Sequence, residues 1–316
     1  MTASQPTLQC MEVWGGNQAS DNGVIMPGLD AWVISRPYEG DDAGGDIHYV
    51  SSCNTGRITR ILVADVSGHG KHVAAVASAL RTLMRRFVNY IDQTKLMAGL
   101  NQEFAALAEM GSFATAVVAT FWAPTDSLVI SNAGHPRPIW YRAKTKAWQL
   151  LDAKVEDPAA GLANIPLGIA EPTAYDEFSI RLSPGDLVLL YTDSLIEAAA
   201  SGGRQLGEQG LVGLLNRLDA SSPHSLLPAL LAAVEAHADG PPRDDVTALL
   251  LRPNTLKPRS NPVVGLRAGW SLLRALVASL LPGGQPFPLP QLTIQNILGS
   301  FIAPLNRRGR SKNPAR

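Results

Sequence analysis

The sequence predicts an α+β fold, a layered sandwich of strands and helices, on three observations. Along the chain the predicted elements run as strands, two helices, strands, two helices and a final strand. Strands and helices therefore fall into separate groups, which argues against the steady alternation of a doubly wound parallel sheet. The chain has 316 residues, of which 46% are hydrophobic, and so it is long enough to bury a sizeable core as one large domain or two small ones.

The predicted strands are short runs of β-branched, aromatic and other apolar residues separated by turn residues. They cover residues 29–35, 47–52, 58–66, 114–122, 127–132, 138–142, 177–182, 187–192 and 246–251. Residues 1–28 are rich in Gly, Asn, Ser and Gln without a sustained period, which predicts an irregular lead-in. The segment 157–172 contains Gly and Pro and predicts a long loop, a feature often linked to function in compact domains.

Four segments carry a helical pattern, and residues 71–90 carry it most clearly. The apolar residues that recur there at helical spacing are Val73, Val76, Ala77, Leu80, Leu83, Met84 and Phe87. Arginines at positions 81, 85 and 86 lie off this stripe, so the helix is predicted to be amphipathic. Further helices are predicted at about 93–109, 206–218 and 224–238.

The formal net charge of zero hides an uneven distribution of charge. Residues 255–316 contain nine Lys or Arg and no Asp or Glu, which leaves 18 basic and 27 acidic residues in 1–254. This distribution predicts a lead-in at 1–28, a globular domain at 29–254 and a basic extension at 255–316. No nucleic-acid partner is expected for the acidic body.

Compartment signals are few. Cys10 and Cys53 are the only cysteines, too few for a disulfide framework. The first basic residue is Arg36, so the N-terminus lacks the charged and apolar regions of a secretory signal, and no run of about 18 apolar residues marks a membrane span. We expect a cytoplasmic protein.

Four aspartates stand where a predicted strand ends or a turn begins: Asp46, Asp65, Asp193 and Asp244. If their carboxylates converge, they form an all-oxygen site of the kind that Mg²⁺ or Mn²⁺ prefers and Zn²⁺ does not. Each one taken alone is more simply an ordinary turn aspartate, because Asp is common at turns and helix caps. Spacing leaves both interpretations open.

Two other catalytic interpretations are disfavoured. Gly68-His69-Gly70-Lys71 resembles part of a phosphate-binding loop, but Asp65 stands where that motif requires its first Gly and His72 takes the Ser/Thr position. Ser67, His69 and Asp193 could be combined into a hydrolase triad, yet the chain has no Gly-x-Ser-x-Gly elbow.

Several short motifs follow one another in an order that is specific when they are taken together. They are Gly44-Gly45-Asp46, Asp65-Val66-Ser67-Gly68-His69-Gly70, Asn132-Ala133-Gly134-His135-Pro136, Pro166-Leu167-Gly168-Ile169, Leu182-Ser183-Pro184-Gly185-Asp186 with Tyr191-Thr192-Asp193, Glu197-Ala198, and Asp244-Asp245-Val246-Thr247. Over about residues 29–252 the chain resembles the metal-dependent protein phosphatases of the protein phosphatase 2C type. Within that family it is similar to the bacterial sporulation and stress-response branch, SpoIIE- and RsbU-like.

The resemblance implies a four-layer αββα sandwich with two metal ions, Mn²⁺ or Mg²⁺, at one edge. It implies that Asp65 bridges the two ions and that the backbone carbonyl of Val66 adds a ligand. Asp193 and Asp244 resemble ligands of the first ion, and Asp46 a ligand of the second, directly or through water. Asp65, Asp193 and Asp244 would then be the catalytic residues, and metal-activated water would attack the phosphate.

The same resemblance implies a serine/threonine protein phosphatase acting on a phosphorylated regulatory protein, typically an anti-sigma-factor antagonist. Two positions depart from the pattern. Ser194 replaces the Gly that usually follows the third aspartate, and His69 lies four residues beyond Asp65, so the general-acid role of a His in eukaryotic relatives is not transferred. For His69 a helix-entry or phosphate-contact position remains open, and for His135 a structural turn or core position.

The alternative function is a phosphatase-fold module that binds a partner with weak or no catalysis, motivated by Ser194 and by the extension. Within 264–281, Arg267, Ser271 and Arg274 fall on one helical stripe among apolar residues, which fits a helix lying on an anionic membrane surface or on a protein partner. The expected contact with such a surface or partner extends over residues 264–316. A solvated extension is the simpler interpretation. The sequence leaves the substrate, the preferred metal and the oligomeric state open.

Overall fold

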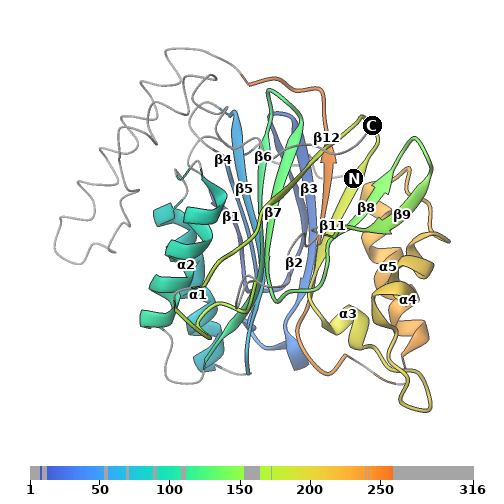
Figure 1. The fold of residues 1–316 in the computed structure, drawn as a ribbon. Coiled ribbons are helices and arrows are strands. Elements are labelled where there is room, and N and C mark those ends of the chain that lie inside the picture. The colour runs from blue at the N-terminus through green and yellow to red at the C-terminus, as the bar shows by residue number, and fades with distance from the viewer. Residues whose placement is uncertain are drawn as a thin grey trace.

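Two antiparallel sheets stacked face to face form the centre of the molecule, and a pair of helices covers each outer face (Figure 1). The computed structural model describes residues 8, 13–52, 56–68, 71–87, 90, 92–107, 112–152, 164–171, 173–238, 240 and 242–258. Helices α1 and α2 pack on one sheet, and α4 and α5 on the other (Figure 1). The predicted α+β sandwich of four layers is confirmed.

The first sheet has the strand order β1-β4-β5-β6-β7-β10 and the second the order β2-β3-β12-β11-β8-β9. The strands of the first sheet are β1 Val13–Gly16, β4 Asp46–Ser52, β5 Ile58–Val66, β6 Ala114–Trp122, β7 Ser127–Ala133 and β10 Phe178–Arg181. Those of the second are β2 Ser20–Met26, β3 Leu29–Arg36, β12 Val246–Pro253, β11 Leu187–Tyr191, β8 Ile139–Arg142 and β9 Ala147–Leu150. The helices are η1 Tyr38–Gly40, α1 Lys71–Phe87, α2 Gln93–Leu107, α3 Ser194–Glu197, α4 Gly207–Leu215 and α5 Pro223–His237.

Three hydrophobic cores hold the four layers together. On β5, Leu62 and Ala64 face α1 and α2, whereas Ile61 and Val63 face the second sheet. Since successive side chains of a strand point to opposite faces, a strand buried on both faces must be apolar at almost every position. This explains the apolar run at residues 61–64 in the middle of β5, which is flanked by Thr59 and Arg60 on one side and Asp65 on the other.

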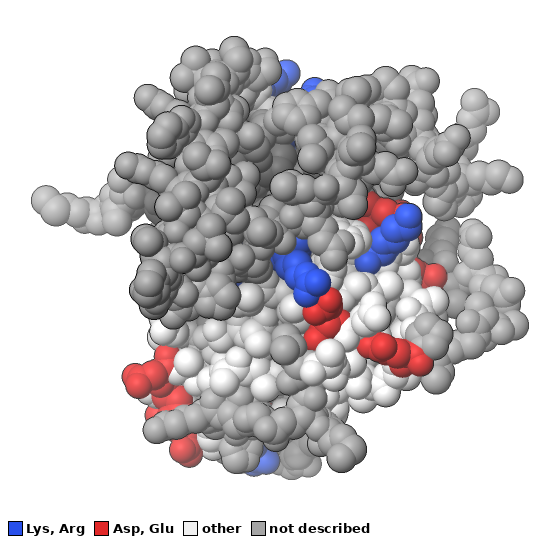
Figure 2. All heavy atoms as spheres, turned by 90° about the vertical axis from the view of Figure 1, so that its left-hand side faces the viewer, with Lys and Arg blue, Asp and Glu red and all other residues white. Residues whose placement is uncertain are grey.

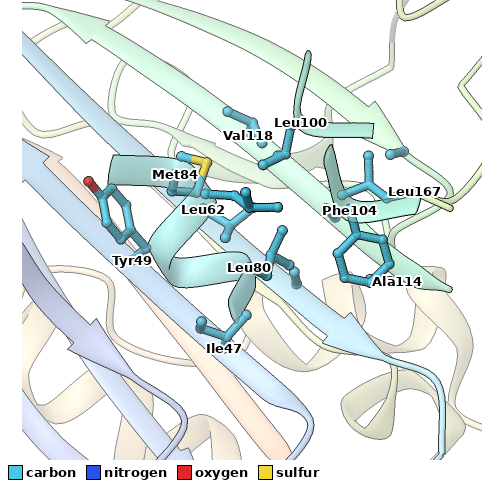
Figure 3. Close-up of a cluster of buried hydrophobic side chains, with 14 of the residues drawn as sticks. Ile47, Tyr49, Leu62, Leu80, Met84, Leu100, Phe104, Ala114, Val118 and Leu167 are labelled. Atoms are coloured by element: carbon cyan, nitrogen blue, oxygen red, sulfur yellow. The ribbon is translucent and has the colours of Figure 1, made fainter. Parts of the chain in front are cut away.

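Helices α1 and α2 are held chiefly by their apolar side chains. Leu80, Met84, Leu100 and Phe104 point from the two helices onto β4, β5 and β6 (Figure 3). Figure 2 shows this side of the molecule, where a few acidic and basic side chains lie on a described surface that is mostly uncharged. The ion pair of Arg86 with Glu103, at 2.7 Å, is partly exposed, and such pairs contribute at most about 1 kcal/mol.

The structure differs from the sequence-based expectation at the N-terminus. The irregular lead-in predicted for 1–28 contains two strands, because β1 pairs with β4 and β2 pairs with β3. Three further elements were not expected: the short 3-10 helix η1, the strand β9, which pairs with β8, and the short helix α3. The globular unit therefore includes residues from Val13 onward.

Two other expectations are met only in part by the described residues. In the long loop predicted for 157–172, residues 157–163 and 172 lie outside the described residues, but Leu167 forms a two-way backbone pair with Ala114 of β6 (2.8 and 3.0 Å). The extension beyond residue 258 also lies outside them. Within the described part of the chain, no helix combines the length and the hydrophobicity needed to cross a bilayer.

Candidate metal centre

Asp46 and Asp65 lie opposite each other on two neighbouring strands. Asp46 is the first residue of β4, and in the antiparallel register of β4 and β5 it lies directly opposite Asp65. The side chain of Asp46 is buried, whereas Asp65 is partly exposed. Residues directly opposite each other in such a pair have Cα atoms about 4.5–5.5 Å apart, so the ladder itself brings these two carboxylates together.

Asp193 and Asp244 come from the second sheet. Asp193 follows β11 and stands at the N-cap position of α3, where its side chain makes no capping hydrogen bond, and Asp244 precedes the adjacent antiparallel strand β12. The end of one strand and the start of its antiparallel neighbour lie at the same edge of a sheet. A backbone hydrogen bond from Thr192 to Thr247 (3.0 Å) extends the pairing beyond Tyr191 and so draws the two segments together.

A side-chain hydrogen bond joins the two sheets at this edge. The Thr192 hydroxyl donates to Oδ2 of Asp46 over 2.7 Å, although the two residues are 146 positions apart in the chain. The structure therefore brings together the four aspartates that the sequence singles out. They come from the ends or starts of β4, β5, β11 and β12.

The electrostatics of the site show the same convergence. Burial raises the pKa of Asp65 to about 7, and the charges of Asp193 and Asp244 add to that rise. Burial also raises the pKa of Asp46, with Asp65 as the next cause, while the Thr192 hydrogen bond opposes the rise. Burial and then Asp244 raise the pKa of Asp193. Repulsion between the negatively charged carboxylates favours their protonated forms and so raises their pKa values. A bound cation would remove this repulsion.

The donor set fits a hard divalent cation. The carboxylates supply oxygen ligands, and Val66, the last residue of β5, adds a backbone carbonyl. A Cβ at Gly45 would lie 2.9 Å from that carbonyl oxygen, so the glycine keeps the oxygen uncovered. Among the described residues, no three His, Cys, Asp or Glu side chains form by themselves a group that could hold a metal ion. Main-chain and water oxygens would have to complete the coordination, as is common for Mg²⁺.

Asp245 holds the backbone in place, whereas its neighbour Asp244 is one of the four candidate metal ligands. Its carboxylate accepts backbone N–H groups from Tyr38 (2.6 Å), Gly45 and Asp46 (3.2 Å), and so it anchors the loop that leads into β4. A Cβ at Gly44 would collide with this carboxylate, which accounts for the glycine in the Gly44-Gly45-Asp46 motif. Asp245 is thus engaged in holding the backbone.

His135 lies in a structural position. Its backbone N–H donates to Oδ1 of Asn132 (2.7 Å), and its ring Nδ1 lies 2.8 Å from the hydroxyl of Thr115 on β6. Burial lowers the pKa of this imidazole to about 3, so the ring is neutral near pH 7. Gly134 has a positive φ (67°), and a Cβ at this position would collide with Pro166. The glycine of the motif at 132–136 therefore packs against the proline of the motif at 166–169. His69 lies outside the described residues.

Two groups of the site were missed as site residues by the sequence reasoning. Burial and the charges of Asp193 and Asp244 raise the pKa of Glu197, which places this carboxylate beside the two aspartates. Glu197 belongs to a motif that the sequence analysis noted without assigning it a role. Thr192 was noted only as part of Tyr191-Thr192-Asp193. Its contact with Asp46 could not be predicted from sequence spacing, because the two residues lie far apart in the chain.

Comparison with known proteins gives the relatives of this chain. A family model described as "Stage II sporulation protein E (SpoIIE)" matches residues 55–254. The chain is 24% identical over 225 residues to the phosphoserine phosphatase RsbU of Bacillus subtilis, which covers 71% of this chain and 63% of RsbU. It is 25% identical over 146 residues to the phosphoserine phosphatase RsbP of the same organism, covering 45% of this chain and 34% of RsbP. The chain thus spans less than two thirds of the length of either curated relative.

Solved structures share the fold. The RsbU and RsbW domains of a Mycobacterium tuberculosis protein superpose with a TM-score of 0.61 at 23% identity, covering 81% of this chain and 74% of theirs. The PP2C phosphatase domain of SpoIIE from Bacillus subtilis, solved with a fragment of its regulatory domain, gives 0.59 at 16% identity, covering 78% and 64%. The SiaA PP2C domain of Pseudomonas aeruginosa gives 0.57 at 19% identity, covering 70% and 84%. At these identities the likeness concerns the fold alone.

Proposed function

The chain belongs to the family of stage II sporulation protein E (SpoIIE), and on that premise we propose that it is a metal-dependent serine/threonine protein phosphatase. The observation that carries the proposal is the meeting of Asp46 and Asp65 from one sheet with Asp193 and Asp244 from the other. Ordinary turn aspartates have no reason to gather in one place, because unneutralised carboxylates repel one another.

Asp65, Asp193 and Asp244 would hold one metal ion and Asp46 and Asp65 a second, with the backbone carbonyl of Val66 as a ligand of one of the two. When bound, two Mn²⁺ or Mg²⁺ ions would supply water activation and neutralise charge on the phosphate. The protein's own contribution is to hold these oxygens on rigid strand ends and to bury Asp46. With no protein nucleophile assigned, catalysis would rest on positioning and charge neutralisation.

For the substrate we propose phosphoserine or phosphothreonine on a regulatory protein of the anti-sigma-factor-antagonist kind. The support is family membership together with two relatives that are named phosphoserine phosphatases. We also propose that the basic extension contacts an anionic partner, because residues 255–316 carry nine basic and no acidic side chains.

The alternative is a partner-binding module with weak or no catalysis. Ser194 was one reason for it, since a side chain replaces the usual Gly beside Asp193. Ser194 is the first residue of α3, and the described residues with positive φ do not include it. The backbone at this position therefore accepts a side chain without strain, and Ser194 no longer supports the binding-module alternative.

The proposed function is tested by Mn²⁺-dependent release of phosphate from a phosphoserine peptide. Wild type is compared with Asp65→Asn and Asp193→Asn, and with Asp126→Asn, a partly exposed turn aspartate between β6 and β7, as the matched control. Losing about 3 kcal/mol of metal-centred stabilisation would slow the first two variants roughly 100-fold, while the control keeps the wild-type rate. Equal rates in all four proteins would show that the site is wrongly assigned. Absence of any Mn²⁺ or Mg²⁺ binding in the millimolar range would favour the binding module.

A further inference from the structure

Thr192 lies at the junction of the two sheets. It follows β11 directly, precedes Asp193, and is fully buried. Its hydroxyl donates to Oδ2 of Asp46 (2.7 Å) and accepts the backbone N–H of Thr247 (3.0 Å). One side chain of the second sheet thus contacts a carboxylate of the first sheet.

The hydrogen bonds of Thr192 set the direction of its hydroxyl proton. A hydroxyl has one donor and two acceptor sites. Because an N–H group can only donate, the bond from the Thr247 N–H occupies an acceptor site. The single proton is directed to Asp46 at 2.7 Å, since the carbonyl oxygen of Thr247, a second acceptor, lies farther away at 3.4 Å. The backbone N–H of Asp46 in turn donates a hydrogen bond to the carboxylate of Asp245 (3.2 Å). Its main chain and its carboxylate are therefore both held by residues that flank strands of the second sheet.

From this geometry we propose that Thr192 is a positioning residue for the metal centre, a role that rests on the proposed function. Its hydroxyl engages one oxygen of Asp46 and orients the carboxylate toward the second ion. Because the next residue is Asp193, the same hydrogen bond sets the spacing between the carboxylates of the two sheets. Groups that orient metal ligands through hydrogen bonds commonly change metal affinity 10- to 100-fold when they are removed.

The test compares Thr192→Val, which removes the hydroxyl and keeps the shape, with Thr192→Ser, which keeps the hydroxyl. Thr59→Val is the matched control. Thr59 is equally buried on β5, six residues from Asp65, which is roughly 20 Å at about 3.3 Å per residue. Calorimetric titration with Mn²⁺ in the absence of substrate gives affinities that do not depend on turnover. The Mn²⁺ dependence of phosphate release is measured alongside.

We expect Thr192→Val to bind Mn²⁺ at least 10-fold more weakly at one site and to need correspondingly more Mn²⁺ for half-maximal rate. Thr192→Ser should stay within about threefold of wild type, and Thr59→Val should match it. A hydroxyl with only a structural role would lower the unfolding temperature of Thr192→Val and leave its Mn²⁺ affinity unchanged.

The outcomes separate this inference from the proposed function. Wild-type affinity in Thr192→Val overturns the positioning role and leaves the phosphatase proposal standing. Weakened binding in Thr192→Val with no phosphate release by wild type supports the positioning role and overturns the proposed catalysis. A wild-type protein that binds no Mn²⁺ overturns both.

Discussion

Asp65 combines burial with the charges of several acidic neighbours, and this predicts how stability depends on pH. In the unfolded chain an aspartate loses its proton near pH 4, whereas burial and the charges of Asp193 and Asp244 raise the folded pKa of Asp65 to about 7. Between these values the folded state binds more protons, so the free energy of unfolding falls as the pH rises. Asp46 and Glu197, whose pKa values are also raised, act in the same direction.

The expected result is a lower unfolding temperature at pH 8 than at pH 5 for the protein in EDTA. Asp65→Asn should show a smaller decrease, because the amide does not ionise. Mn²⁺ should restore stability mainly at the higher pH, since the ligands bind as carboxylates. Calorimetric scans at a series of pH values measure all three effects, and an unfolding temperature that rises from pH 5 to pH 8 in EDTA would contradict the assignment.

At this scale the sequence singled out the four aspartates that the structure brings together. Asp46, Asp65, Asp193 and Asp244 could be chosen because each stands at the boundary of an apolar run or beside glycine. The supporting contacts could not be predicted in the same way. The hydrogen bonds of Asp46 reach Thr192 and Asp245, 146 and 199 positions away, and only the stacking of the two sheets brings these residues together.

At the scale of elements, the junction between the loop before β4 and the start of β12 depends on Asp245. We predict that Asp245→Ala lowers the free energy of unfolding by about 2–4 kcal/mol, because the N–H groups of Tyr38, Gly45 and Asp46 lose a charged acceptor. Urea unfolding in EDTA measures the change.

The neighbouring substitution Asp244→Ala is the matched comparison. It removes a carboxylate whose charge contributes to the raised pKa values of Asp65 and Asp193, and so it should cost little stability in EDTA. It should instead abolish most of the stabilisation that Mn²⁺ provides. If the two alanine variants lost stability equally, the division of roles between Asp244 and Asp245 would be wrong.

Elements with a clear period were predicted well, and those defined by their partners were not. The stripe in α1 and the apolar run of β5 carry their own signal, since each buries a regular set of side chains. In contrast, β1 is Val-Trp-Gly-Gly and β2 begins Ser-Asp-Asn-Gly, compositions that indicate turns. Both strands form because β4 and β3 offer them an edge to pair with, and a sequence pattern does not reveal that edge.

At the scale of the whole molecule, the site depends on the packing of one sheet on the other. The core between the sheets, with Ile61 and Val63 from β5 and Val188 and Leu190 from β11, fixes the distance across which Thr192 reaches Asp46. Because each sheet contributes part of the carboxylate set, neither half of the sandwich could form the site alone. Folding of the complete double sheet and assembly of the metal centre are therefore expected to be one event.

The division of charge along the chain leads to the last prediction. Residues 255–316 carry nine basic and no acidic side chains, whereas 1–254 carry 27 acidic and 18 basic ones. We predict that the 316-residue chain sediments with phosphatidylserine-containing vesicles at low salt and is released at about 0.5 M NaCl, because salt screens such attraction.

A chain ending at residue 258 should remain in the supernatant. Arg267→Glu combined with Arg274→Glu should weaken binding, since each basic residue near the surface contributes about 1 kcal/mol. Equal sedimentation of the long and short chains, or of vesicles with and without anionic lipid, would refute an electrostatic role for the extension.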